Sequence, residues 1–115
     1  MTTIAAARAV LAAAVGAVDA QSTSAACYVY SNGSSMDRLG QSGVQWDFRV
    51  TCAVGQRGTD AVASAELEAL VAAKLAILNA LAGWGIAGVS SDGMRTIGGG
   101  EQLSADIAVF TKVDI

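Results

Sequence analysis

The fold is decided by the stretch QWDFRVTCAV (residues 45–54), in which large apolar side chains alternate with mostly polar ones. A period of two is typical of a β-strand that has one face against the core and the other in water. Because aromatic and β-branched side chains suit a pleated, half-buried surface, this strand is expected to pack against a second apolar layer. The predicted core face consists of Trp46, Phe48, Val50, Cys52 and Val54, and the predicted wet face of Gln45, Asp47, Arg49, Thr51 and Ala53.

The second layer is predicted to begin with an N-terminal amphipathic helix. Thr2 or Thr3 can cap it, and its apolar stripe continues to about Ala20. The same region imitates a short signal peptide, because Arg8 precedes an apolar run that ends in small residues before Gln21. We expect a structural helix here rather than a cleaved leader, and one too short and too rich in alanine to cross a bilayer.

A second helix is predicted after the central strand. Thr59 or Asp60 can cap its start, and Gly83 is placed to end it. Between them, leucine, isoleucine and valine recur every three or four residues. This spacing predicts a long helix with one face on the sheet.

Three further strands complete the predicted sheet. The first spans Ala26–Tyr30, and the last spans Leu103–Ile115, where apolar and polar side chains again alternate. Between them, Ile86–Val89 is either a short edge strand or the start of one longer, bulged strand that ends at Ile97. Glycines 98–100 are expected to turn the chain, since no lysine-serine or lysine-threonine pair follows them to make a phosphate-binding loop.

The order helix, strand, strand, helix, strand, strand predicts a single α+β domain over residues 1–115. We expect a two-layer sandwich, with an antiparallel sheet of about four strands and both helices on one face. The segment Ser31–Gly43 is rich in glycine and serine, and it predicts a long loop at about residues 31–44. Because long loops in compact domains are commonly functional, this one is expected to contact a partner.

The composition argues against an enzyme. The chain has no histidine, which is the usual general base and the commonest metal ligand. Its net charge of −3 and pI of about 4.6 disfavour a protein that binds nucleic acid through phosphates. We therefore predict no catalytic residue, no cofactor and no metal site.

The two cysteines, Cys27 and Cys52, both lie at predicted core-facing strand positions. Their number and spacing suit neither a disulfide framework nor a metal site. Two interpretations stay open: a pair of buried, reduced thiols, or a bridge between the two strands.

The stretch from Gln45 to Gly55 and the residues after it resemble the aromatic-x-aromatic-Arg-Val-Thr strand, short turn and long helix of the tail terminator (neck) proteins of long-tailed bacteriophages. The stretch Gly99–Val109 is similar to the hairpin and final strand of that family, especially in actinobacterial phages. The likeness extends over nearly the whole chain, the leading helix included. It departs at Ser31–Gly43, which lacks the proline-rich stretch of many members.

The resemblance implies a structural virion protein that is assembled in the host cytoplasm. Six copies would form a ring that caps the tail tube, stops its polymerisation and joins it to the head-connector protein. DNA would pass through the lumen without specific binding, and no membrane would take part. The alternatives are another neck component, such as a head-closure or connector ring or a tail-tube subunit, and a small secreted binding domain.

The predicted interface residues are of three kinds. Two are strand tyrosines on the less buried face, three lie in the predicted long loop, and three are charged residues expected near subunit or lumenal surfaces. They are Tyr28 and Tyr30, then Met36, Asp37 and Arg38, then Asp47, Arg49 and Arg57.

Overall fold

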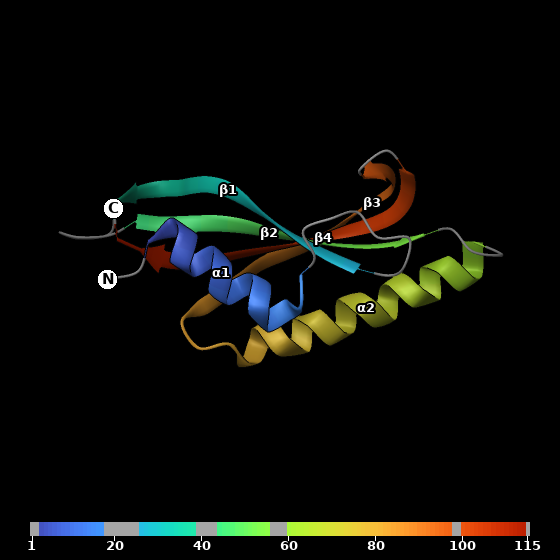
Figure 1. Cartoon of the computed structure of the whole chain (residues 1–115), viewed down its shortest axis with the longest axis horizontal. Helices are drawn as coiled ribbons and strands as arrows, with labels where there is room; N and C mark the ends of the chain where they lie inside the picture. Colours follow the sequence, from blue (N-terminus) through green and yellow to red (C-terminus); the bar gives the residue numbers. More distant parts are fainter. Residues whose placement is uncertain (1–2, 18–25, 39–43, 56–59, 98–99, 115) are drawn as a thin grey trace.

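The computed structural model describes residues 3–17, 26–38, 44–55, 60–97 and 100–114, with the side chains of 32, 34–38, 55, 60, 91–97 and 100–102 outside the description. Two helices and four strands follow one another in the predicted order, and both helices lie on the same side of one sheet (Figure 1). They are α1 (Ile4–Val15), β1 (Ala26–Arg38), β2 (Val44–Gly55), α2 (Asp60–Ala80), β3 (Trp84–Ile97) and β4 (Gly100–Val113). The predicted two-layer α+β architecture is therefore confirmed. Neither of the described helices is both long and apolar enough to cross a membrane.

The sheet is antiparallel, with the strands in the order β1-β2-β4-β3. The two central strands, β2 and β4, pair without a register shift from Val44 opposite Val113 to Gly55 opposite Gln102. Both edge strands contain register shifts, two in β1 and two in β3. The strand with the clearest alternation in the sequence thus occupies the regular centre, and the irregularities fall at the edges.

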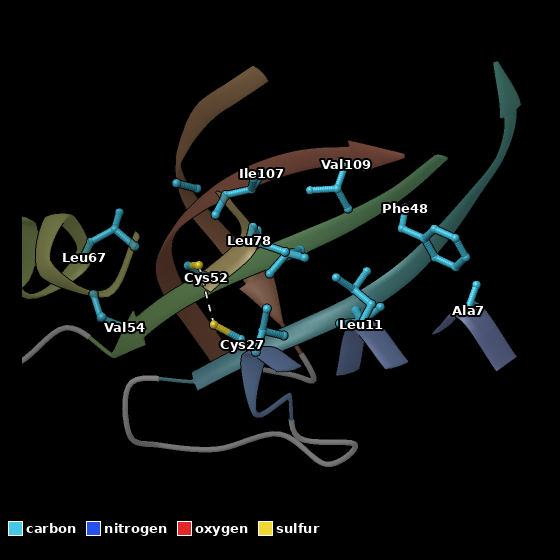
Figure 2. Close-up of a cluster of buried hydrophobic side chains, with 14 of the residues drawn as sticks. Ala7, Leu11, Cys27, Phe48, Cys52, Val54, Leu67, Leu78, Ile107 and Val109 are labelled. Atoms are coloured by element: carbon cyan, nitrogen blue, oxygen red, sulfur yellow. Dashed lines mark hydrogen bonds between the residues drawn. The ribbon is translucent and has the colours of Figure 1, made fainter. Parts of the chain in front are cut away.

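The core lies between the central strands and the two helices (Figure 2). Phe48 of β2 is fully buried, together with Leu11 of α1, Leu78 of α2 and Ile107 of β4. Single methyl groups of alanine fill much of each helix surface, so the larger apolar side chains supply most of the buried area. One continuous cluster therefore holds the two layers together.

Trp46 and Trp84 close the core beside Phe48. Trp46 is half-buried, and its indole Nε1–H donates a hydrogen bond to the Ser31 hydroxyl over 2.7 Å. The ring centroids of Trp84 and Phe48 lie 5.5 Å apart with the planes tilted by 58°, a favourable aromatic arrangement. The prediction that Trp46 and Phe48 face the helices is confirmed, although only Phe48 is fully enclosed.

The predicted loop at about residues 31–44 is wrong over residues 31–38, because β1 continues through them to Arg38. Extra residues are absorbed by register shifts between Ser31 and Gly33 and between Ser34 and Arg38. Gly33 adopts a φ of +92°, which a residue with a side chain rarely does. Glycine and serine have weak strand propensity, but pairing with β2 outweighs it. Residues 39–43 lie outside the described part of the chain.

The first helix is shorter than predicted. Thr3 caps it as expected, since the Ala6 N–H donates to the Thr3 hydroxyl oxygen over 3.1 Å. The helix ends at Val15, because Gly16 takes the left-handed conformation, with φ of +66° and ψ of +39°. The expected continuation to Ala20 is therefore wrong, and Gly16 is a C-terminal cap rather than a helical residue.

The second helix and the strand after it agree more closely with the prediction from the sequence. The helix ends at Ala80, and Gly83, with a φ of +85°, lies in the turn that leads into β3. Of the two strands considered for the next segment, the longer is confirmed, since β3 reaches Ile97 with register shifts on either side of Val89.

The sheet face opposite the helices is less exposed than predicted. Thr51 and Ala53, assigned to the wet face, are both buried, as is Ser104 of β4. The Thr51 hydroxyl donates to the Asp106 carboxylate over 2.8 Å, which satisfies its hydrogen-bonding need away from water. Alternation assigns each residue to a side of the sheet but does not reveal whether that side is covered.

Phe48→Ala should destabilise the fold strongly, because the removed ring is fully buried and leaves a cavity. We expect a loss of about 3–5 kcal/mol in the free energy of unfolding, measured by urea denaturation. Val62→Ala is the control, since Val62 is 55% exposed, and it should change stability by less than about 0.5 kcal/mol. Equal effects of the two substitutions would contradict the placement of the core.

Candidate subunit interface

Tyr30 and Arg49 form the best-defined part of the predicted interface. They are directly opposite in the pairing of β1 with β2, and the Arg49 guanidinium carbon lies 4.6 Å from the centre of the Tyr30 ring. This is the geometry of a cation–π contact. Tyr30 is 39% exposed, whereas Arg49 is half-buried and its buried Nε has no hydrogen-bond partner among the described residues. The Tyr30 ring is therefore the described contact partner of the Arg49 guanidinium.

Tyr28 does not share this exposure. Only 5% of it is accessible, and it packs with Ala26 and Ala53 in a small second cluster. Tyr28 lies on the face away from the helices as predicted, opposite Thr51, but the expected exposure of its ring is wrong. Its role at an interface stays a prediction. Both neighbours in this cluster are alanines, Ala26 on the same strand and Ala53 on β2.

Asp47 lies on the same face as Arg49, two residues earlier in β2, and it is half-buried. Its partner across the sheet is Phe110 of β4, which in turn lies opposite Gly85 of β3. A Cβ atom on Gly85 would come within 3.0 Å of three ring atoms of Phe110. The Phe110 ring therefore lies across the glycine, a contact that the sequence analysis missed, although an aromatic residue opposite a strand glycine is its signal.

Tyr30, Asp47, Arg49 and Phe110 together are called the open-face patch. They come from β1, β2 and β4, and each is exposed or half-buried. Arginine, tyrosine and phenylalanine are enriched at protein interfaces. The structure thus gathers three of the predicted residues and adds Phe110.

The remaining predicted residues are placed only in part. Met36, Asp37 and Arg38 form the end of edge strand β1, and their side chains lie outside the description. Arg57 lies outside the described residues altogether. Their roles at an interface stay predictions.

One side chain already occupies the free edge of β1. Arg8 of α1 donates from Nη2 to the Val29 carbonyl oxygen over 3.0 Å. An unpaired carbonyl on an edge strand is a site where another strand can add, so this bond protects the edge near Val29. The sequence analysis noted Arg8 only as part of a signal-peptide-like region, although a lone arginine in an alanine-rich helix was the available clue.

An apolar groove lies on the helix side of the sheet, between α2 and strands β3 and β4. Its volume is about 580 Å³, and its walls include Leu67, Val71 and Leu75 of α2, Val89 of β3 and Leu103 of β4. Glu68 and Ser64 are its polar lining. The groove is open because α2 covers the inner part of the sheet more closely than the β3 side.

These surfaces can bind but offer little for chemistry. Among the described residues, no three or more acidic or cysteine side chains gather as a metal site would require. The absence of catalytic residues, cofactor and metal stays a prediction. What the described residues present is the open-face patch, an apolar groove and two long edge strands.

No family model and no curated protein matches the chain. The likeness to tail terminators therefore stays a hypothesis that depends on the residues quoted for it.

The contact between Tyr30 and Arg49 should be measurable in a double-mutant cycle. Tyr30→Leu, Arg49→Met and the double variant remove the ring, the charge or both while keeping apolar bulk. We expect a coupling free energy of about 0.5–1 kcal/mol in urea denaturation, because the pair is only partly shielded from water. Additive effects of the two substitutions would show that the stacking contributes nothing to stability.

Proposed function

We propose that this protein is a structural component of a bacteriophage neck. On this proposal, six copies form a ring that caps the tail tube, ends its polymerisation and joins the tail to the head connector. No reaction takes place, and the mechanism is geometric, since identical contacts related by rotation cover surfaces that one copy leaves open.

The observation that carries the proposal is the incomplete cover of a small open sheet. The edge strands β1 and β3 have 13 and 14 residues, long for strands with only one partner each in the described chain. The open-face patch adds partly exposed aromatic and charged side chains on the sheet face away from the helices, and the apolar groove adds accessible hydrophobic surface. Neighbouring copies in a ring would bury such surfaces, which otherwise favour uncontrolled aggregation.

Two properties of the whole chain support the same proposal. The element order agrees with the order expected from the resemblance to tail terminators. A net charge of −3 suits a lumen through which DNA slides, because a basic lumen would retain the phosphates.

The proposal is tested by adding the purified protein to polymerising tail-tube protein. We expect tubes that stop growing and carry a six-fold ring at one end in negative-stain electron micrographs. Light scattering should show whether the ring also forms without tubes. If the tubes grow unchanged and no end carries the protein, the capping role is wrong. Labelling all along the tube would instead identify a tube subunit.

Reversal of charge at the end of β1 should weaken assembly without unfolding the protein. Asp37→Lys and Arg38→Glu change side chains at the outer end of an edge strand, where we place a contact with a neighbouring copy or ring. The expected results are a circular dichroism melting curve like that of the wild type and fewer capped tubes.

Glu66→Lys is the matched control for this prediction, since Glu66 is exposed on α2. It makes the same change in charge as Asp37→Lys, away from the sheet edge. Normal capping by Asp37→Lys and Arg38→Glu would refute the placement of this segment at the interface.

A further inference from the structure

Cys27 and Cys52 are directly opposite each other on β1 and β2 (Figure 2). Their sulfur atoms lie 3.5 Å apart, and both residues are free thiols, 2% and 0% exposed. Each buried thiol therefore has a second thiol within reach on the adjacent strand.

The strand pairing places the two cysteines in a geometry that a disulfide can adopt. The Val29 carbonyl accepts from Arg8 on α1, which indicates that Val29 directs its backbone groups away from β2. Val29 therefore forms a non-hydrogen-bonded pair with Val50. Because the two kinds of pair alternate along an unbroken antiparallel register, the Cys27–Cys52 pair, two residues away, is of the same kind. Their Cα atoms are typically about 4.5 Å apart, within the range that disulfides span.

We propose that Cys27 and Cys52 are a dithiol that peroxide oxidises to a cross-strand disulfide, which locks edge strand β1 onto β2. The sulfurs need only approach from contact distance to bonding distance, which rotation of the side chains allows without a change of register. This inference does not depend on the proposed function.

The thiols are not equivalent. The hydrogen bond from Cys52 lowers the pKa of Cys27, against the effect of burial, and the nearby Lys74 charge acts in the same direction. The same hydrogen bond and burial raise the pKa of Cys52. A lowered pKa favours the thiolate form of Cys27, so we assign the first attack to its sulfur.

The oxidation balances with hydrogen peroxide as oxidant. The Cys27 thiolate attacks one peroxide oxygen, the O–O bond breaks, and the departing hydroxide takes up a proton and leaves as water. The Cys52 sulfur then attacks the sulfenic acid on Cys27, the S–O bond breaks, and that hydroxyl leaves as water with the proton from Cys52. Two thiols and one peroxide yield one disulfide and two waters.

The burial of the pair favours a small oxidant. Cys27 is the second residue of an edge strand, so limited opening of β1 at Ala26 exposes it. Peroxide is little larger than water and can enter through such an opening. Oxidised glutathione must form a bulky mixed disulfide with a buried sulfur, so it should react more slowly.

The test treats the wild-type protein with hydrogen peroxide and maps its peptides without reduction. We expect a linked peptide that contains Cys27 and Cys52. The intact monomer should lose the mass of two hydrogen atoms, whether or not other residues also gain oxygen, and a phosphine reductant should reverse this change. The melting temperature of the oxidised protein should rise by roughly 10 °C, because the bond restrains the unfolded chain. The matched Cys27→Ala/Cys52→Ala variant should show no such rise.

Three outcomes would overturn the inference. In the first, both thiols of the peroxide-treated protein still react with an alkylating reagent after unfolding. In the second, the cysteines become sulfinic acids without forming a bridge. In the third, the disulfide links two chains. Any of them leaves the proposed ring untouched, since none concerns assembly onto tubes.

Discussion

The fold depends on the unbroken pairing of β2 with β4 in the middle of the sheet. Because no bulge interrupts this pairing, every second residue of both strands points at the helices. That places Phe48 and Ile107 in one layer of apolar side chains, onto which α1 and α2 pack. If the register of one strand shifted by one residue, its apolar side chains would point away from the helices and into water. The core and the register therefore specify each other.

Around this centre the edges carry the irregular features. Bulges bend β1 and β3, Gly85 leaves room for the Phe110 ring, and Arg8 occupies an outward carbonyl of β1. The bulges and the Arg8 contact both limit uncontrolled strand addition while an edge remains open. The cysteine pair also lies at this edge, where Cys27 of edge strand β1 contacts Cys52 of central strand β2.

The candidate interface was only partly predictable. Alternation in β2 correctly placed Asp47 and Arg49 on the face away from the helices. It could not show that Arg49 would stack on Tyr30, because that contact depends on the pairing of two strands. The contact of Tyr28 with Ala53 likewise depends on the pairing of β1 with β2. Side-chain partners from other elements leave no periodic signal in the sequence.

The sequence by itself determined the type and order of the elements, since the periods of two and of about 3.6 are local properties of the chain. A threonine cap at Thr2 or Thr3 was predictable for the same reason, because the capping hydrogen bond spans one turn, and the structure shows that Thr3 makes it. Only the tertiary structure decided that β1 continues through its glycines and serines to Arg38, and that Thr51 is buried on the face expected to be wet. Contacts between distant segments outweigh weak local preferences, and their free energy appears only once the sheet has formed.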